Sequence, residues 1–520
     1  MEEAAATSRT MFRAHGAITV LLVLVFWQSA LARSETVPAA LEQARADCAQ
    51  GRFAEAEQEL RAFLSRYPAS AEAHALLAFA EWKSGRLPQA AEEFRAALRA
   101  NPNSFSAHYN FGMLCLEQRN LREGIEHLRR AAEMQTDNAG VQYNLAVALL
   151  ENKQAAQAII SLERANSLEP ERPETQFQIL RAHLSLRQFE TATQESAKLD
   201  SAHPESAAAI GSAWLEHERP AEAIAYFREA LERDRTNVGL RNALATALID
   251  AGRPADVLQL ISDPGSATEH FLMARAQYEL NRPGAALKEC RRAIELEPAN
   301  AQYLLFAARL LQHTGNREAN EFIARAITAA PEWYEPFYSR AVGFYMQQNY
   351  NNAVAALEDA LRRNPQCARC LFLLGITRFN QGDKQGAEPT LQRAVALDPD
   401  NARYRAHLGV LYLSAGRIQQ AETQLAKAVA LSPRYALAFY EVGKLQLRAG
   451  RLDAAAKSLA RARDLDPALT QAQYQLAQVY LKTGRRAEAE QLFAQFRQTK
   501  AEQDEAALQR SDVETGVAAP

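Results

Sequence analysis

The chain has 520 residues, and its 59 lysines and arginines nearly balance 62 aspartates and glutamates, which leaves a formal net charge of -3. This balance excludes a surface dominated by positive charge, the usual mark of a protein that binds nucleic acid. Hydrophobic residues make up 48% of the chain, far more than in disordered sequences, so most of it is expected to fold.

The N-terminal segment 1–32 has the pattern of a secretory signal. Arg9 and Arg13 precede an apolar run from Ala17 to Trp27, and the small residues of Ser29 to Ala32 offer a cleavage site. The apolar run is well short of the roughly 20 residues that a membrane-spanning helix needs. We therefore expect a cleaved signal peptide and an exported, periplasmic or extracellular protein. An uncleaved N-terminal membrane anchor and a cytosolic protein with a misleading start are the alternatives.

The rest of the chain repeats itself about every 34 residues, and the repetition is most regular between Tyr334 and Lys500. A period of this length indicates stacked helical hairpins, each too small to bury its apolar faces alone. Prolines mark the late position of the regular units at Pro365, Pro399, Pro433 and Pro467. Fourteen units can be placed, starting near Val37, Ala71, Phe105, Ala139, Pro173, Pro204, Val238, Ala267, Asn300, Tyr334, Ala368, Ala402, Ala436 and Thr470.

The unit that begins at Ala402 shows why the pattern predicts two helices and a turn. Leu408 and Tyr412 share one face of a first helix, and Gly409 allows the second helix to approach without an intervening side chain. Gly416 suits the left-handed conformation that ends a helix. Pro433 then ends the second helix, because proline lacks an amide hydrogen and clashes with the preceding turn.

This pattern resembles the tetratricopeptide repeat from about Val37 to Lys500. The family's usual order is a bulky residue, leucine and glycine, an aromatic residue, alanine, an aromatic residue or leucine, alanine and proline. It appears here as Phe439, Val442, Gly443, Ala455, Leu459, Ala462 and Pro467. The resemblance implies an all-α fold, a right-handed superhelical solenoid of about fourteen antiparallel helix pairs. It also implies a concave groove lined by the first helices. A polar helix from Ala487 to about Gln509 is predicted to cap the solenoid.

Departures from the repeat suggest how the chain divides. The unit from Val238 is short and runs into Ser262–Ser266, which contains adjacent proline and glycine. We expect an N-terminal array over 33–262 and a C-terminal array with the cap over 263–509, joined either by a local distortion or by a hinge. Residues 510–520 lose the periodicity and are expected to be disordered. In the unit from Pro173, serine and leucine replace the usual leucine and alanine at Ser196 and Leu199, which predicts looser packing.

No catalytic motif or cofactor-binding loop is present, and no segment outside the repeats is long enough for an enzyme domain. We expect neither enzyme activity nor a cofactor or metal. Cys367 and Cys370 could be a redox or metal pair, a local disulfide or two inert thiols. Cys115 and Cys290 fall at core positions. His74 and His108 occupy equivalent places in successive units, where packing is the favoured role.

Candidate partner-binding residues lie on the predicted first helices. Aromatic residues recur at the fifth position, where they could either pack against the next helix or also contact a ligand, since tyrosine and phenylalanine are favoured in binding sites. The predicted groove residues are Tyr109, Asn110, Tyr143, Asn144, Phe177, Tyr338, Phe372, Tyr440, Lys444 and Tyr474, and Phe271 shares the same position in its repeat. The family's carboxylate clamp of lysine and asparagine is not matched, and only scattered basic groups such as Arg369 and Arg403 reach the groove.

The sequence therefore predicts an exported, non-catalytic scaffold. Its groove would bind a peptide or protein partner and support assembly of protein complexes in the cell envelope. An accessory protein of a polysaccharide export or glycosylation system is one alternative, and a membrane-anchored regulator is another. No nucleic-acid partner is expected.

Overall fold

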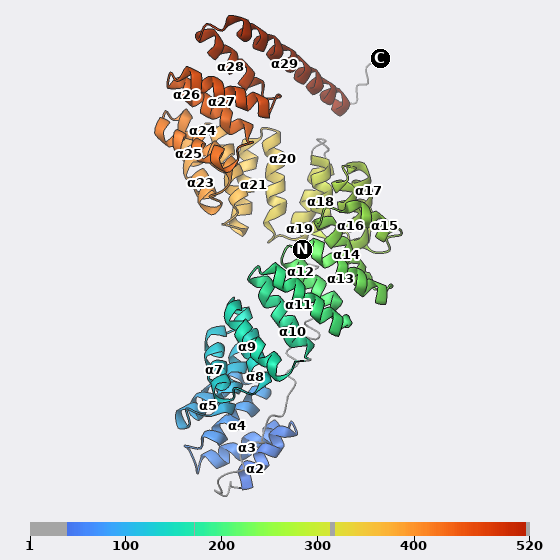
Figure 1. Cartoon of the computed structure of the whole chain (residues 1–520), viewed down its shortest axis with the longest axis vertical. Coiled ribbons are helices and arrows are strands. Elements are labelled where there is room, and N and C mark those ends of the chain that lie inside the picture. The colour runs from blue at the N-terminus through green and yellow to red at the C-terminus, as the bar shows by residue number, and fades with distance from the viewer. Residues whose placement is uncertain (1–38, 171, 313–317, 516–520) are drawn as a thin grey trace. The chain divides into compact units, whose positions relative to one another are not determined.

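The computed structural model describes residues 39–170, 172–312 and 318–515, and for residues 39, 40 and 504–515 the backbone only. The predicted signal peptide lies outside the described residues. The chain divides into two compact units, one up to Asp263 and one from Pro264 (Figure 1). Whether Ser262–Ser266 acts as a hinge stays a prediction.

The first unit is entirely helical over its described residues. Each odd-numbered helix packs against the even-numbered helix before it, and each pair then contacts the next pair. The helices are α2 (Ala39–Ala49), α3 (Phe53–Leu64), α4 (Ala71–Lys83), α5 (Leu87–Ala100), α6 (Phe105–Glu117), α7 (Leu121–Met134), α8 (Ala139–Glu151), α9 (Ala155–Leu168), α10 (Pro173–Ser185), α11 (Phe189–Ala202), the 3-10 turn η1 (Pro204–Ser206), α12 (Ala207–Glu216), α13 (Pro220–Arg233), α14 (Val238–Asp250) and α15 (Pro254–Leu260).

The second unit continues the same pairing, so the described residues contain fourteen helix pairs and the predicted all-α repeat fold is confirmed. Its helices are α16 (Ala267–Glu279), α17 (Pro283–Leu296), α18 (Ala301–Gln312), α19 (Glu318–Ala329), α20 (Tyr334–Met346), α21 (Tyr350–Arg363), α22 (Ala368–Asn380), α23 (Lys384–Leu397), α24 (Ala402–Ser414), α25 (Ile418–Leu431), α26 (Ala436–Arg448), α27 (Leu452–Leu465), α28 (Thr470–Lys482) and α29 (Arg486–Thr515).

Local signals explain where the first helices begin. The Ser104 hydroxyl accepts a hydrogen bond from the backbone amide of Ala107 at 3.3 Å, and this satisfies one of the unpaired amides at the start of α6. The side chain of Asn401 does the same for Tyr404 at the start of α24, at 3.2 Å. The predicted helix starts therefore depend on local chemistry that the sequence displays directly.

The tight turn inside each pair requires a backbone conformation that glycine adopts most easily. Gly416 follows α24 with φ of +73°, as predicted. Other pairs use residues with a side chain at the same place, such as Lys153 at +59° and Gln348 at +57°. Glycine is therefore favoured at this turn but is not essential.

Glycine has a different role inside the first helices, where it permits close helix contact. A Cβ atom on Gly409 would lie 2.7 Å from Cγ of Leu425 on α25, and one on Gly443 would lie 2.6 Å from Cγ of Leu459 on α27. Atoms at such distances must move apart. The predicted close approach at Gly409 is thus present in the structure.

The unit from Pro173 buries both of its unusual residues, while α10 and α11 contact each other less extensively than the helices of most other pairs, in agreement with the predicted looser packing. Ser196 and Leu199 on α11 are both fully buried. The Ser196 hydroxyl accepts a hydrogen bond of 2.9 Å from Nε1 of Trp214, which is on α12 and is also buried. The unusual serine therefore provides the partner that a buried indole needs.

The last helix, α29, covers the end of the second unit. Leu492 is buried, and the rings of Phe493 and Phe496 lie 5.6 and 5.4 Å from the ring of Tyr474 on α28. The helix runs to Thr515, further than the predicted end near Gln509 and into the segment 510–520 that was expected to be disordered. A polar helix with one apolar side is what a terminal cap of a repeat array needs.

Candidate functional site

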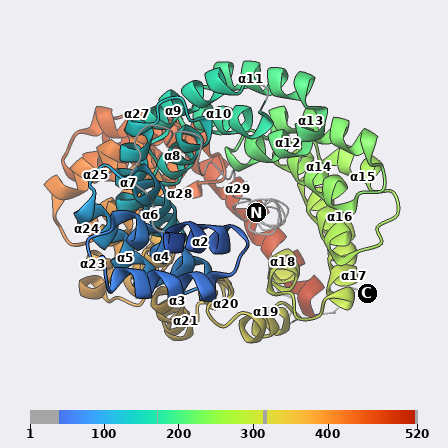
Figure 2. The same cartoon turned by 90° about the horizontal axis from the view of Figure 1, so that it is seen from below.

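The first helices of the pairs form one side of each unit, which we call the first-helix face. Figure 2 shows α10, α12 and α14 on the inner side of an arc in the first unit, with α11, α13 and α15 outside them. In the second unit the same view places α18 inside α19. The predicted groove residues all belong to first helices, but they differ in how accessible they remain.

In the first unit the predicted residues form contacts between neighbouring first helices. Nδ2 of Asn144 on α8 donates a hydrogen bond of 2.8 Å to the hydroxyl of Tyr109 on α6. The guanidinium of Arg172 lies 4.8 Å from the ring centroid of Tyr143. Tyr109 and Tyr143 are half-buried, and burial raises the pKa of both phenols. These side chains therefore bridge successive pairs while keeping part of each ring exposed.

Two other predicted residues of the first unit differ in exposure. Asn110 is buried beside Phe111 in α6, whereas Phe177 on α10 is half-buried. The two asparagines therefore do not form a ladder, because Asn144 is bonded to a tyrosine and Asn110 is covered.

In the second unit the aromatic residues fall into two groups. Phe271 and Phe372 are buried, and each packs on a tyrosine of the next first helix, Phe271 on Tyr303 and Phe372 on Tyr404, both with ring centroids 4.6 Å apart. Tyr338 and Tyr440, in contrast, remain half-exposed. The first group holds the helices together, and the second leaves ring surface free.

Tyr474 is the most exposed of the predicted aromatic residues, at 39%. Its ring nevertheless packs against Phe493 and Phe496 of the cap helix. Its surroundings are thus set by α29 as well as by the first helices.

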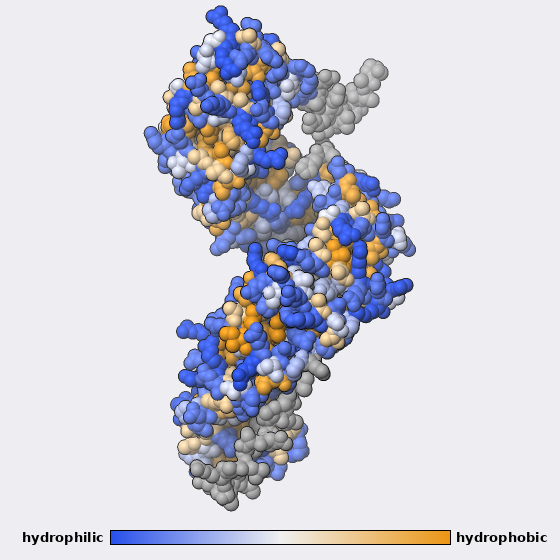
Figure 3. Space-filling model, viewed as in Figure 1, coloured by the Kyte–Doolittle hydropathy of each residue, from blue (hydrophilic) through white to orange (hydrophobic). Residues whose placement is uncertain are grey.

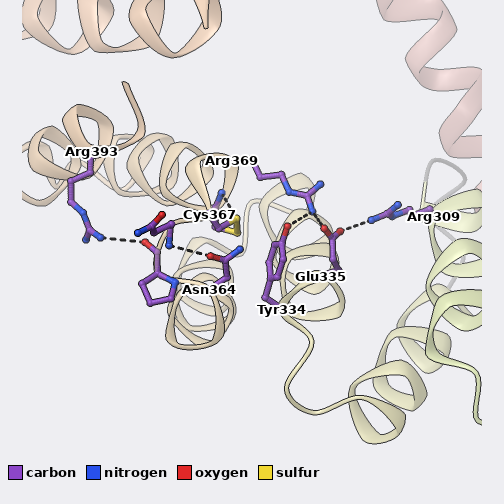
Figure 4. The surroundings of a disulfide bond; sticks show 10 residues. Arg309, Tyr334, Glu335, Asn364, Cys367, Arg369 and Arg393 are labelled. Atoms are coloured by element: carbon purple, nitrogen blue, oxygen red, sulfur yellow. Dashed lines mark hydrogen bonds and ion pairs between the residues drawn. A yellow bond between two sulfur atoms is a disulfide. The ribbon is translucent and has the colours of Figure 1, made fainter. Parts of the chain in front are cut away.

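Basic residues on this face of the second unit lie close to the aromatic rings. Arg369 on α22 donates a hydrogen bond of 3.2 Å to the Tyr334 hydroxyl and forms an ion pair with Glu335 on α20. Glu335 also pairs with Arg309 on α18 at 2.7 Å, so three successive first helices are joined, as Figure 4 shows. The Lys444 ammonium contacts Glu441 at 2.9 Å and lies 5.0 Å from the ring centroid of Tyr440.

The cysteine pair forms a disulfide, which selects one of the three interpretations left open by the sequence. Cys367 precedes α22 and Cys370 lies in its first turn, with Cα atoms 5.2 Å apart. Both are buried, and Sγ of Cys367 accepts from the amide of Cys370 at 3.2 Å, in the place where other units use serine or asparagine (Figure 4). Arg369 lies between the two cysteines in the sequence, so the disulfide closes the helical turn that contains Arg369.

The remaining cysteines of the described chain are buried thiols. Burial raises the pKa of Cys48 to about 11 and that of Cys115 and Cys290 to about 12. These groups stay protonated near neutral pH and are poor nucleophiles. Nowhere in the described ranges do three or more histidine, cysteine, aspartate or glutamate side chains gather as a possible metal site.

The two equivalent histidines pack within their own units and do not meet each other. His74 lies 2.5 Å from a carboxylate oxygen of Glu93 and 3.0 Å from the Pro68 carbonyl. His108 makes the corresponding contacts at 2.9 Å with His127 and at 3.0 Å with the Pro102 carbonyl. Both histidines link a first helix to its second helix and to the preceding turn.

His407 on α24 was not singled out from the sequence, yet it lies in the middle of the aromatic and basic cluster. Its ring meets Phe372 edge to face at 5.1 Å. Burial, with a smaller effect from the Arg403 charge, lowers the pKa of His407 to about 4. Its aromatic neighbour lies on the preceding first helix, about one repeat away in the sequence, so helix periodicity could have indicated the cluster only once the repeats were aligned.

The lowered pKa of His407 predicts a loss of stability in acid. The unfolded chain takes up a proton near pH 6.5 and the folded chain only near pH 4, so stability is lost as the pH falls through this window. We expect protonation of His407 to lower the free energy of unfolding by about 2 kcal/mol at most between pH 7 and pH 5. Urea unfolding of the native chain and of His407→Gln at several pH values measures it. Parallel pH profiles for the two proteins would contradict this role of His407.

The outer surface of the described chain mixes apolar and polar residues in both units (Figure 3). Within the described ranges no helix is both long and apolar enough to cross a membrane. The partly exposed aromatic rings of the first helices therefore stand out mainly by their recurrence and by the basic groups beside them.

Comparison with known proteins gives matches along most of the chain. Two family models, both described as tetratricopeptide repeat, match residues 41–105, 109–173, 177–238 and 338–402, and residues 215–277, 379–440 and 446–510. A search of curated protein sequences gives no match.

Similar solved structures include three crystal structures of limited identity. The APC/C hetero-tetramer Cut9-Hcn1 is 17% identical with a TM-score of 0.43, covering 85% of this chain and 89% of that chain. Yeast Tom70 is 16% identical with a TM-score of 0.36, covering 87% and 96%. YrrB, described as a TPR protein with an unusual peptide-binding site, is 24% identical with a TM-score of 0.30, covering 35% and 95%.

Proposed function

Because the chain belongs to the tetratricopeptide repeat family, we propose that it is a non-catalytic scaffold whose first-helix face binds an extended segment of a protein partner. The observation that carries this proposal is the row of partly exposed tyrosines, Tyr109, Tyr143, Tyr338 and Tyr440, that recurs on the first helices. Tyrosine offers a large contact area with few rotatable bonds, and a hydroxyl that can also form hydrogen bonds.

The buried members of the row support the same function indirectly. Phe271 and Phe372 fix the distance between neighbouring first helices by packing on Tyr303 and Tyr404. A surface whose spacing is fixed before binding loses little entropy when a ligand arrives. The face is therefore suited to an extended ligand that contacts several repeats at once.

The experiment is a selection of displayed peptides on the purified protein, followed by affinity measurements on the selected peptides. We expect the double variant Tyr338→Ala with Tyr440→Ala to weaken binding about tenfold or more, since buried tyrosines at interfaces commonly contribute more than ~1 kcal/mol each. The matched control is Tyr67→Ala, which removes a 54% exposed tyrosine near the end of α3, away from the first helices. Equal affinity for all three proteins, with unchanged thermal unfolding, would show that another surface binds the peptides.

We further propose that the protein is exported and acts in the cell envelope. The support is the arginine-led apolar segment and small-residue site in 1–32. Determining the N-terminal residue of the mature protein tests this. A mature chain beginning near Arg33 is expected, and a chain that retains Met1 would contradict the cleavage.

A further inference from the structure

Three basic groups on the first-helix face of the second unit lie over aromatic rings. Arg369 lies 4.7 Å from the ring centroid of Tyr338, and Arg403 lies 5.1 Å from that of Phe372. Lys444 lies 5.0 Å from the ring centroid of Tyr440. A cation held over a ring has a defined position, so a ligand need not order it on binding.

The three cations differ in how their charge is balanced. Arg369 pairs with Glu335, and Lys444 pairs with Glu441. Among the residues that the structure describes, none places a carboxylate within ion-pair distance of Arg403. Its side chain is exposed. The middle cation of the three is therefore the one left for a ligand.

The rings around Arg403 are uncharged, while the charges of Asp398 and Arg369 also act on Tyr404. Phe372 and Tyr404 are stacked aromatic rings, and Tyr435, which directly precedes the next first helix, α26, is close enough for the Arg403 charge to act on it. His407 also contacts Phe372, and its lowered pKa keeps it neutral near pH 7. An exposed guanidinium between neutral rings has a stronger attraction for an anion than one surrounded by acidic side chains.

We propose that Arg403, with Phe372, Tyr404 and Tyr435, forms a subsite for one carboxylate of the partner's extended segment, which carries apolar side chains on either side. This inference rests on the proposed function and specifies its ligand. The guanidinium binds the carboxylate with charge-assisted hydrogen bonds, and the partly exposed rings of Tyr338 and Tyr440 contact the flanking apolar side chains.

The spacing of the ligand follows the order of the first helices, because Tyr440 lies on α26, next to α24, whereas Tyr338 lies on α20, two first helices before α24. Packed helices are about 8–10 Å apart. A polyproline-type peptide rises about 3.1 Å per residue and returns to the same face every third residue, so one helix step corresponds to about three residues. The expected ligand pattern is therefore apolar–x–x–x–x–x–acidic–x–x–apolar.

The neighbouring charges are already paired, which limits the free charge of the subsite to that of Arg403. Glu335 on α20 pairs with Arg309 and Arg369. Glu441 on α26 pairs with Lys444. Within the described ranges Arg403 therefore offers one unpaired positive charge, which matches a single carboxylate in a peptide segment.

The test uses a fluorescently labelled peptide, LPPPPPEPPL, and the same peptide with glutamine in place of glutamate. Fluorescence anisotropy with the full chain at low salt should show the glutamate peptide binding about tenfold more tightly, and the preference should shrink as salt is raised. Arg403→Gln should abolish the preference, and Arg403→Lys should keep part of it. The control Arg461→Gln removes an exposed arginine from the second helix α27 and should retain the full preference.

Each other outcome has a defined meaning. Equal binding of the two peptides by the native protein, or an unchanged preference in Arg403→Gln, overturns the inference. The native protein could bind both peptides equally, and the double variant Tyr338→Ala with Tyr440→Ala could bind both more weakly. In that case the proposed function stands, and only the carboxylate subsite at Arg403 is refuted. The inference is also overturned if the native protein binds neither peptide with a dissociation constant below about 1 mM.

Discussion

Replacing Trp214 by alanine is expected to lower the free energy of unfolding by about 3–5 kcal/mol, because a large aromatic side chain is lost from a closely packed core. The indole is 1% exposed and lies between α11 and α12, with the ring of Phe189 at 6.3 Å. Its removal would leave a cavity that the two helices cannot easily fill. Denaturant unfolding, followed by tryptophan fluorescence and by circular dichroism, measures the loss.

A second variant separates the hydrogen bond from the packing. Ser196→Ala keeps the indole but leaves its N–H without the Oγ acceptor at 2.9 Å, which should cost about 1–3 kcal/mol. In a Trp214→Phe background the same serine change should cost much less, because no N–H remains to be satisfied. Equal costs in the two backgrounds would mean that the hydrogen bond does not stabilise the fold.

Replacing Gly409 by alanine is expected to destabilise the second unit by about 1–3 kcal/mol, because the added methyl group would lie 2.7 Å from Cγ of Leu425. Alanine is normally more favourable than glycine inside a helix, so helix propensity alone would make this substitution stabilising. A loss of stability would therefore indicate the steric clash with Leu425. The control is Gly284→Ala in α17, where nothing lies within 4 Å of the new Cβ. That change should stabilise the protein by about 0.5–1 kcal/mol. Thermal unfolding in which both variants shift the same way would contradict the steric explanation.

Most of the helix pattern could be predicted because the determinants of each element are local. Asn401, Gly409, Gly416 and Pro433 each specify a cap, a contact, a turn or an end within one unit. The start of α12, the first helix of the sixth pair, was predicted less accurately, near Pro204. Pro204 begins a 3-10 turn there, and the α-helix starts only at Ala207.

Contacts between successive helix pairs were harder to predict, since they join residues on different repeats. Ser196 looked unfavourable in isolation because the tryptophan that it bonds lies on the next pair. Likewise, the pattern at Glu335 gave no sign that the carboxylate joins Arg309 and Arg369. The sequence shows the position of such residues in the repeat, whereas their partners depend on how successive pairs stack.

The aromatic row illustrates the same limit at the candidate site. All its members share one position in the repeat, yet Phe372 is buried under Tyr404 while Tyr338 is half-exposed. Each ring has an arginine of the next first helix over it, Arg369 for Tyr338 and Arg403 for Phe372. Of the two, only Phe372 is also covered by a large ring, Tyr404, whose place is taken by Cys370 in the preceding repeat. The exposure of the ring at this position is thus decided by the next helix pair along the chain.

The cap helix restricts how a protein of this kind can lengthen during evolution. Phe493 and Phe496 of α29 cover the ring of Tyr474, and Leu492 is buried beside α28. A duplicated pair placed after α29 would meet mainly exposed polar side chains over the described residues 486–503. A pair inserted before α28 would meet repeat surfaces on both sides. Growth of the second unit by gene duplication is therefore expected to occur internally, with the terminal pair kept in place.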